Sequence, residues 1–202
     1  MTPEKYATEY MPQLHGWCEP EKALDMIAGV RSEQPRVCVE IGVFAGRSLF
    51  AVAMALKEIG LGHVYGIEPW APQPCKQGLP DEDANAQWWE SLDHTHIQDL
   101  FYDHRRALDV EDYCSVFKKT SEEALGYIKS LGAIDFLHID GNHSEEVSCL
   151  DVDNYLPLMR PGGQIWFDDV DWESTKQAQR KLHDKCDVVR VMKSYGLFRV
   201  KS

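Results

Sequence analysis

The sequence predicts an α/β fold with a seven-stranded, mostly parallel sheet, helices on both faces and a C-terminal antiparallel hairpin. Two observations predict it. Short runs rich in β-branched residues alternate with segments of helical length, which is typical of βαβ units in a parallel sheet. The last two runs lie close enough in sequence to pair as antiparallel neighbours. The expected architecture is therefore Rossmann-like.

Seven strand-like runs support this prediction. The first five are separated by helix-length segments, and the last two by a short turn. They span residues 36–41, 63–68, 112–118, 134–140, 164–168, 188–192 and 196–200.

Helices are predicted between these runs. Apolar residues recur at helical spacing over 47–59, so this segment is expected to pack on the sheet as a helix. Ser121 opens a further helix, and Asn142 or Ser144 caps the next one. A leading helix over 21–30 is expected to cover an edge of the sheet.

The 202 residues fit one domain, since 44% of them are hydrophobic and no repeat or linker interrupts the chain. Residues 1–35 are expected to form an N-terminal helical cover. Residues 69–106, between the second and third strands, are long for a connection and rich in proline and aromatic residues. We expect this insertion to carry helices and to act as a lid.

The charge balance excludes some partners. There are 33 acidic and 21 basic residues, so nucleic acid and anionic membranes would repel the chain. No apolar stretch reaches the roughly 20 residues of a membrane span, and the first residues do not resemble a signal peptide. The six cysteines form no CxxC pair. We therefore expect a cytoplasmic protein that binds neither nucleic acid nor membrane.

A glycine-bearing loop follows the first strand, in the sequence EIGVFAGRS. Ligands bind at the carboxyl ends of strands in open parallel sheets, and Gly42 and Gly46 would let the backbone approach one closely. Phe44 stands where a diphosphate-binding GxGxxG motif needs glycine. Glu40 beside the loop favours a cationic or amine-bearing ligand. A tight turn that needs two glycines is the alternative.

Acidic residues end the second, fourth and fifth strands. Glu68 is suited to binding ribose hydroxyls, with a solvated acid before a proline as the alternative. If the fourth and fifth strands are neighbours, about 4.8 Å apart, Asp140 and the pair 168–169 converge and require a cation. Oxygen ligands favour Mg²⁺, with Ca²⁺ or Mn²⁺ as substitutes. Capping residues and surface acids are the alternative.

Two histidines lie near these acids. His143 follows the fourth strand and is suited to act as a general base beside the metal. His138 lies within the fourth strand, where we expect a hydrogen-bonded core residue.

Residues 36–169 resemble class I methyltransferases that use S-adenosylmethionine. The resemblance lies in VEIGVFAGRS, GIEPW and LPLMRPGGQIWFDD. IDGNHSEE followed by FDD resembles, more narrowly, the metal-dependent O-methyltransferases that act on sugars of macrolide and aminocoumarin natural products.

The resemblance implies roles for individual residues. Glu68 would hold the ribose of the cofactor, and Ser121 would lie near the adenine. His143 would be the catalytic base, beside Asp140. The implied metal ligands are Asp140, Asp168 and Asp169. The residues implied around the methionine part are Glu40, Gly42 and Gly46, and Ser48 and Asp140 are further cofactor-binding residues.

The expected function is metal-dependent transfer of a methyl group from S-adenosylmethionine to a hydroxyl of a small molecule. Related catechol-type enzymes carry lysine where His143 stands and asparagine where Asp169 stands, which favours an alcohol, such as a sugar hydroxyl, as acceptor. Two copies are expected to pair as a homodimer. The alternatives are a nucleotide-binding oxidoreductase, a metal-dependent hydrolase and a catalytically idle domain that binds an adenosyl ligand.

Overall fold

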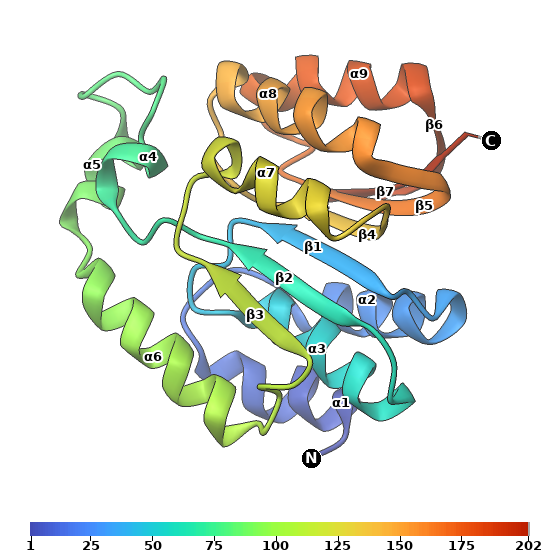
Figure 1. Cartoon of the computed structure of the whole chain (residues 1–202). Coiled ribbons are helices and arrows are strands. Elements are labelled where there is room, and N and C mark those ends of the chain that lie inside the picture. The colour runs from blue at the N-terminus through green and yellow to red at the C-terminus, as the bar shows by residue number, and fades with distance from the viewer. Residues whose placement is uncertain (202) are drawn as a thin grey trace.

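The sheet of the computed structural model, which describes residues 1–201, has seven strands. They are β1 (Val37–Ile41), β2 (His63–Ile67), β3 (Cys114–Phe117), β4 (Ile134–Ile139), β5 (Met159–Asp168), β6 (Cys186–Val191) and β7 (Tyr195–Val200). Their spatial order is β3-β2-β1-β4-β5-β7-β6, as Figure 1 shows. Strands β1 to β5 are parallel, and β7 and β6 are antiparallel. The predicted fold class is confirmed.

The fifth strand begins well before its predicted start. β5 starts at Met159 rather than at residue 164 and takes in the Pro161-Gly162-Gly163 sequence that was expected to precede it. Met159 pairs with Ile134, and the register then shifts before Gln164 pairs with Phe136. The glycines make this irregularity possible, because they tolerate backbone that a regular strand does not use.

The helices are α1 (Pro3–Lys5), α2 (Pro20–Glu33), α3 (Arg47–Ile59), α4 (Pro72–Cys75), α5 (Ala84–Ser91), α6 (His94–Ala107), α7 (Ser121–Ser130), α8 (Glu145–Tyr155) and α9 (Lys176–Lys185). Helices α2, α3 and α6 pack on one face of the sheet, and α7, α8 and α9 pack on the other (Figure 1). In residues 1–201 no helix is both long enough and apolar enough to cross a membrane.

The leading helix α2 covers a face of the sheet rather than an edge. A side chain at Gly29 in α2 would lie 3.5 Å from Trp166 of β5, and β5 has neighbours on both sides. The prediction that this helix covers an edge is therefore wrong. Its first turn reaches the end of the sheet where the parallel strands terminate.

The segment before α2 is tied to the start of α3 by one arginine. The Arg47 guanidinium donates to the carbonyl oxygens of Pro12, Leu14 and Cys18. The Tyr6 hydroxyl donates in return to the carbonyl of Arg47. These bonds fix the N-terminal residues next to the loop that follows β1.

Residues 69–106 contain α4, α5 and α6. Helix α6 packs into the core, where Phe101 stacks on Phe50 of α3 with ring centroids 5.0 Å apart. Helices α4 and α5 lie beyond the arrowheads of β1 to β3 (Figure 1). This segment therefore stands at the ligand-binding end of the sheet, and its role as a lid stays a prediction.

Candidate active site

A cavity opens at the carboxyl ends of the parallel strands. Its walls are the loops after β1, β2, β3 and β4, the first residues of α3 and α8, and parts of the segments before α2 and after β2. The predicted site residues that line it are Gly42, Ser48, Glu68, Ser121, Asp140 and His143. Glu40, Gly46, Asp168 and Asp169 do not line it. The structure thus brings most of the predicted site together around one space.

The two glycines of the β1 loop are required by the backbone. Gly42 has a φ of 84°, and a Cβ there would lie 1.9 Å from the carbonyl oxygen of Asp140. Gly46 has a φ of 94°, and a Cβ there would lie 2.5 Å from the ring of Phe50. The tight-turn alternative therefore accounts for both glycines, while Gly42 also faces the cavity.

Glu68 holds the β1 loop in place. Its Oε2 accepts from the backbone N–H groups of Val43 and Phe44, at 3.1 and 2.9 Å, and its Oε1 accepts from that of Trp70 at 2.9 Å. Burial raises the pKa of Glu68, although these three donors act in the opposite direction. The side chain is 4% exposed, so the alternative of a solvated acid is wrong. A carboxylate has a fourth lone-pair direction left for a ribose hydroxyl.

Glu40 lies beneath the cavity and takes part in a buried chain of hydrogen bonds. Its Oε1 accepts from the Ser48 hydroxyl at 2.8 Å, and its Oε2 accepts from Nδ1 of His138 at 3.0 Å. Lys22 Nζ donates to Nε2 of the same ring at 2.9 Å. Because an ammonium group only donates, Nε2 is the acceptor in this contact, and the proton on Nδ1 is the one that Glu40 accepts. The prediction of a hydrogen-bonded core histidine is confirmed.

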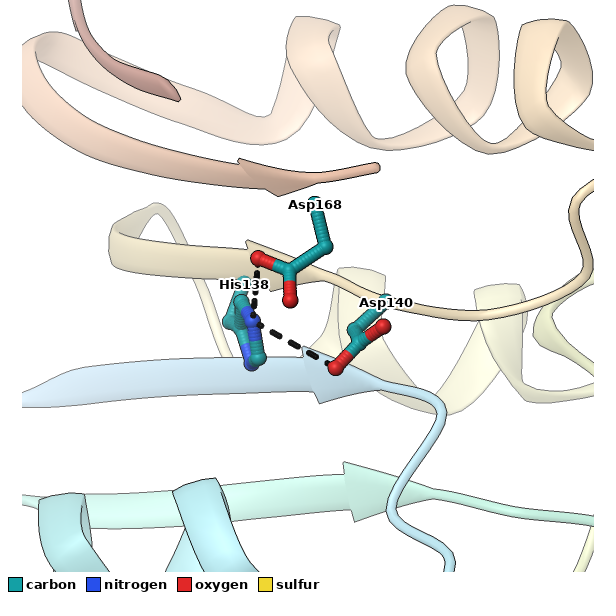
Figure 2. A group of neighbouring side chains, drawn as sticks. All are labelled: His138, Asp140 and Asp168. Atoms are coloured by element: carbon teal, nitrogen blue, oxygen red, sulfur yellow. Dashed lines mark hydrogen bonds and ion pairs between the residues drawn. The ribbon is translucent and has the colours of Figure 1, made fainter. Parts of the chain in front are cut away.

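Lys22 also pairs with the acids that end β4 and β5. Its Nζ forms an ion pair with Asp168 and lies 3.9 Å from Oδ2 of Asp140. Figure 2 shows these two carboxylates converging on His138, whose Nε2 is 3.4 Å from Asp168 and 3.9 Å from Asp140. The Lys22 side chain is 4% exposed.

The charges set the pKa values of this group. Burial alone would raise the pKa of Asp168, but the Lys22 ammonium outweighs burial and lowers it. Burial and then the negative charge of Asp168 raise the pKa of Asp140 to about 8. Asp168 is thus a fixed anion, and Asp140 holds its proton into the neutral range.

Sequence analysis missed Lys22, although the sequence contained a signal. Lys22, Met26 and Val30 follow one another at four-residue spacing on the buried stripe of α2. A lysine on a buried stripe requires an acidic partner in the folded protein. The sequence alone does not say which acid this is.

His143 and Asp169 form a second group beside Asp140. One ligand atom from each of these three residues lies within 4.8 Å of the others. His143 Nε2 forms an ion pair with Oδ2 of Asp169 at 2.5 Å. Both ring nitrogens are buried and, within residues 1–201, have no hydrogen-bond partner. Burial lowers the pKa of His143, and the Asp169 carboxylate outweighs burial and raises it.

The donor groups of this second set fit a hard divalent cation. Asp140 and Asp169 supply carboxylate oxygens, which Mg²⁺ and Ca²⁺ prefer. The unpartnered nitrogens of His143 are polar atoms that the chain itself leaves unsatisfied. Asp168 belongs to the other set, with His138 and Asp140, where Lys22 already balances its charge.

Asp151 is a further polar residue of the cavity that sequence analysis missed. Its Oδ1 accepts from the Ser121 hydroxyl at 2.5 Å, and it is 1% exposed. Burial raises its pKa to about 7. The signal was an acid on the buried stripe of α8, between Ser148 and Tyr155.

Asn142 ties the β4 loop to the segment after β2. Its amide nitrogen donates to the carbonyl oxygens of Pro74, Cys75 and Gln77, at 2.9, 3.0 and 3.0 Å. These three residues line the cavity. One side chain therefore fastens part of the 69–106 segment over the site.

Comparison with known proteins identifies the family. A family model described as "Methyltransferase domain" matches residues 39–170, which include the β1 loop and the acidic ends of β2, β4 and β5. The chain belongs to this methyltransferase family. The resemblance to class I methyltransferases inferred from the sequence is confirmed, and the family assignment replaces the oxidoreductase and hydrolase alternatives. No curated protein sequence matches the chain.

Solved structures share the fold of this methyltransferase. SAH-bound PaMTH1 of Podospora anserina superposes with a TM-score of 0.69 at 14% identity, covering 99% of this chain and 88% of that chain. The O-methyltransferase from Bacillus cereus in complex with SAH gives 0.65 at 17% identity, with 98% and 90% covered. TomG from Streptomyces achromogenes, involved in tomaymycin synthesis and solved with SAM, gives 0.62 at 16%, with 98% and 88% covered.

Proposed function

We propose that this methyltransferase transfers the methyl group of S-adenosylmethionine to a hydroxyl of a small molecule, such as a sugar or another natural product. The observation that carries the proposal is the single cavity that joins the β1 glycine loop, Glu68, Asp140 and the unpartnered His143. The similar structures from Podospora anserina and Bacillus cereus hold SAH, and TomG holds SAM, which supports the choice of cofactor.

The cofactor is expected to lie across the ends of the strands. Gly42 and Ser48 face the methionine part, while Glu40 and Gly46 support that wall from behind. Glu68 faces the ribose, and Ser121 faces the adenine together with Asp151. The acidic walls suit a sulfonium cation.

A divalent cation, Mg²⁺ or in its place Ca²⁺ or Mn²⁺, is proposed at the predicted acidic ligands, with Asp140 and Asp169 in direct contact and Asp168 behind them. When bound, it lowers the pKa of the acceptor hydroxyl and orients it.

His143 takes the proton from the acceptor. The neutral His143 ring has one nitrogen lone pair to receive that proton, and the Asp169 carboxylate, 2.5 Å from Nε2, stabilises the resulting cation. The cavity walls hold the acceptor oxygen roughly 3 Å from the methyl carbon, in line with the bond that breaks. The 69–106 segment, fastened by Asn142, excludes water.

Calorimetric titration with S-adenosylhomocysteine, with Mg²⁺ and with EDTA, tests this proposal. Saturable binding supports the cofactor, and methylation of hydroxylated compounds that EDTA stops supports the ion. The absence of binding in both conditions would contradict the proposal. Binding without turnover on any acceptor would instead favour the idle adenosyl-binding domain.

The remaining expectations also stay predictions. Pairing into a homodimer is measured by sedimentation of the purified chain. The expected cytoplasmic location is consistent with the six free cysteines. The expectation that neither nucleic acid nor membranes are partners is consistent with the net charge of -12.

A further inference from the structure

Lys22 is a buried cation at the centre of the acidic residues. Its ammonium contacts Asp168, donates to His138 Nε2 at 2.9 Å and lies 3.9 Å from Asp140. Three hydrogens on one nitrogen thus face three acceptors. Within residues 1–201, His138, Asp140 and Asp168 also form one of two groups of three whose ligand atoms lie within 4.8 Å of one another (Figure 2).

The ammonium is held in this position by its surroundings. Lys22 lies on the first turn of α2, and the next residues of that face, Ala23 and Met26, are fully buried. The Tyr195 ring packs beside the ammonium at 5.8 Å, and its hydroxyl is bonded to Asp25 of the same helix. The Lys22 side chain is thus enclosed, with 4% of its surface exposed.

An ammonium and a divalent cation compete for the same carboxylates. A metal ion bound to Asp168 and Asp140 would lie within a few ångströms of Nζ, where like charges repel by several kcal/mol even at a protein-like dielectric. Lys22 and the ion therefore exclude one another at Asp168. Asp169 is outside this conflict, since it belongs to the group with His143.

We propose that Lys22 is the resident cation of the group formed by His138, Asp140 and Asp168. It closes this group to divalent metal and confines the ion to Asp140 and Asp169. The inference rests on the proposed function for the ion at Asp140 and Asp169. The exclusion of metal from Asp168 depends on Lys22 alone. Lys22 is a positioning residue, because it acts on the carboxylates rather than on the substrate.

Mn²⁺ titration of the metal-free full-length chain, followed by the electron paramagnetic resonance of free Mn²⁺, tests the proposal. Lys22→Met removes the charge and keeps the length of the side chain. This variant is expected to bind one Mn²⁺ more than the wild type. Lys22→Arg keeps the cation and is expected to bind the same number as the wild type.

Double variants locate the additional ion. Lys22→Met with Asp168→Asn should not bind the additional Mn²⁺, because the Asp168 carboxylate is a ligand of that ion. Asp169→Asn removes a ligand of the other ion, so Lys22→Met with Asp169→Asn should bind one ion more than Asp169→Asn alone. An equal number of ions in Lys22→Met and the wild type, or a gain that Asp169→Asn removes and Asp168→Asn leaves, would overturn the proposal.

Thermal unfolding covers the case in which Lys22→Met folds poorly. Lys22→Met leaves Asp168 buried without its counter-charge and therefore lowers the melting temperature, and Mn²⁺ is then expected to raise the melting temperature of Lys22→Met far more than that of the wild type. An equal rise in both would again overturn the inference. Titration of the same samples with S-adenosylhomocysteine reports on the proposed function separately, so the two can fail independently.

Discussion

Asp151 makes the stability of the protein depend on pH in a direction opposite to that of most carboxyl groups. Burial raises its pKa from 3.8 to about 7, although the hydrogen bond from the Ser121 hydroxyl acts in the opposite direction. Between these two values the unfolded chain loses the proton and the folded chain keeps it. Linkage then requires the free energy of unfolding to fall as pH rises through this window.

The size of the effect follows from the shift. A difference between 3.8 and about 7 corresponds to at most about 4 kcal/mol, lost in full above the folded-state pKa. Asp151→Asn keeps the shape and an acceptor for the Ser121 hydroxyl and cannot ionise. We expect the free energy of unfolding of the variant to exceed that of the wild type. This difference should be about 2 to 3 kcal/mol larger at pH 8 than at pH 5.

Urea unfolding of both proteins at the two pH values measures this difference. Asp153→Asn is the matched control, because Asp153 lies on the same helix in an exposed ion pair with Lys181. Loss of such a pair changes stability by less than about 1 kcal/mol. If Asp151→Asn is no more stable than the wild type at pH 8, or exceeds it by the same free energy of unfolding at both pH values, the reasoning is refuted.

Three further predictions concern the site. His143→Ala should lower kcat on the order of 10² to 10⁴-fold with metal still bound. The acidic limb of the pH–rate profile should also disappear, because it reflects the pKa of His143, which Asp169 raises. If the variant keeps this limb, His143 is not the base. Glu68→Gln turns an amide N–H₂ toward backbone N–H donors and should lower the free energy of unfolding, measured in urea, by about 1–3 kcal/mol. An unchanged free energy of unfolding would mean that Glu68 does not hold the loop. Asn142→Ala should speed dissociation of S-adenosylhomocysteine in stopped flow, and an unchanged rate would show that the α4 segment does not cover the ligand.

The positions of the strands along the chain and the acids at their ends could be predicted because both are local features of the sequence. A strand, the turn that follows it and the next helix are read from residues close together in the chain. Asp140 and Asp168 each end a strand, so their meeting follows once the two strands are neighbours. The same reasoning placed Ser121 and Glu68 at this edge.

Residues that depend on register were not predictable in this way. Glu40 was expected to face the cofactor, but it stands directly across from His138 in the pairing of β1 with β4 and bonds to it instead. Lys22 is separated from Asp168 by 146 positions, and only the docking of α2 on the sheet brings them together. The sequence shows that such residues need partners, while the three-dimensional packing selects them.

The family match begins at residue 39, whereas the lysine in the acidic centre comes from the helix before it. A shortened protein that starts at β1 would keep every residue of the matched region and still lose the counter-charge of Asp168. Such a fragment is expected to recruit cations that the full chain rejects. An activity assigned to this protein from the matched segment alone would leave out Lys22 of α2, and with it the charge that balances Asp168.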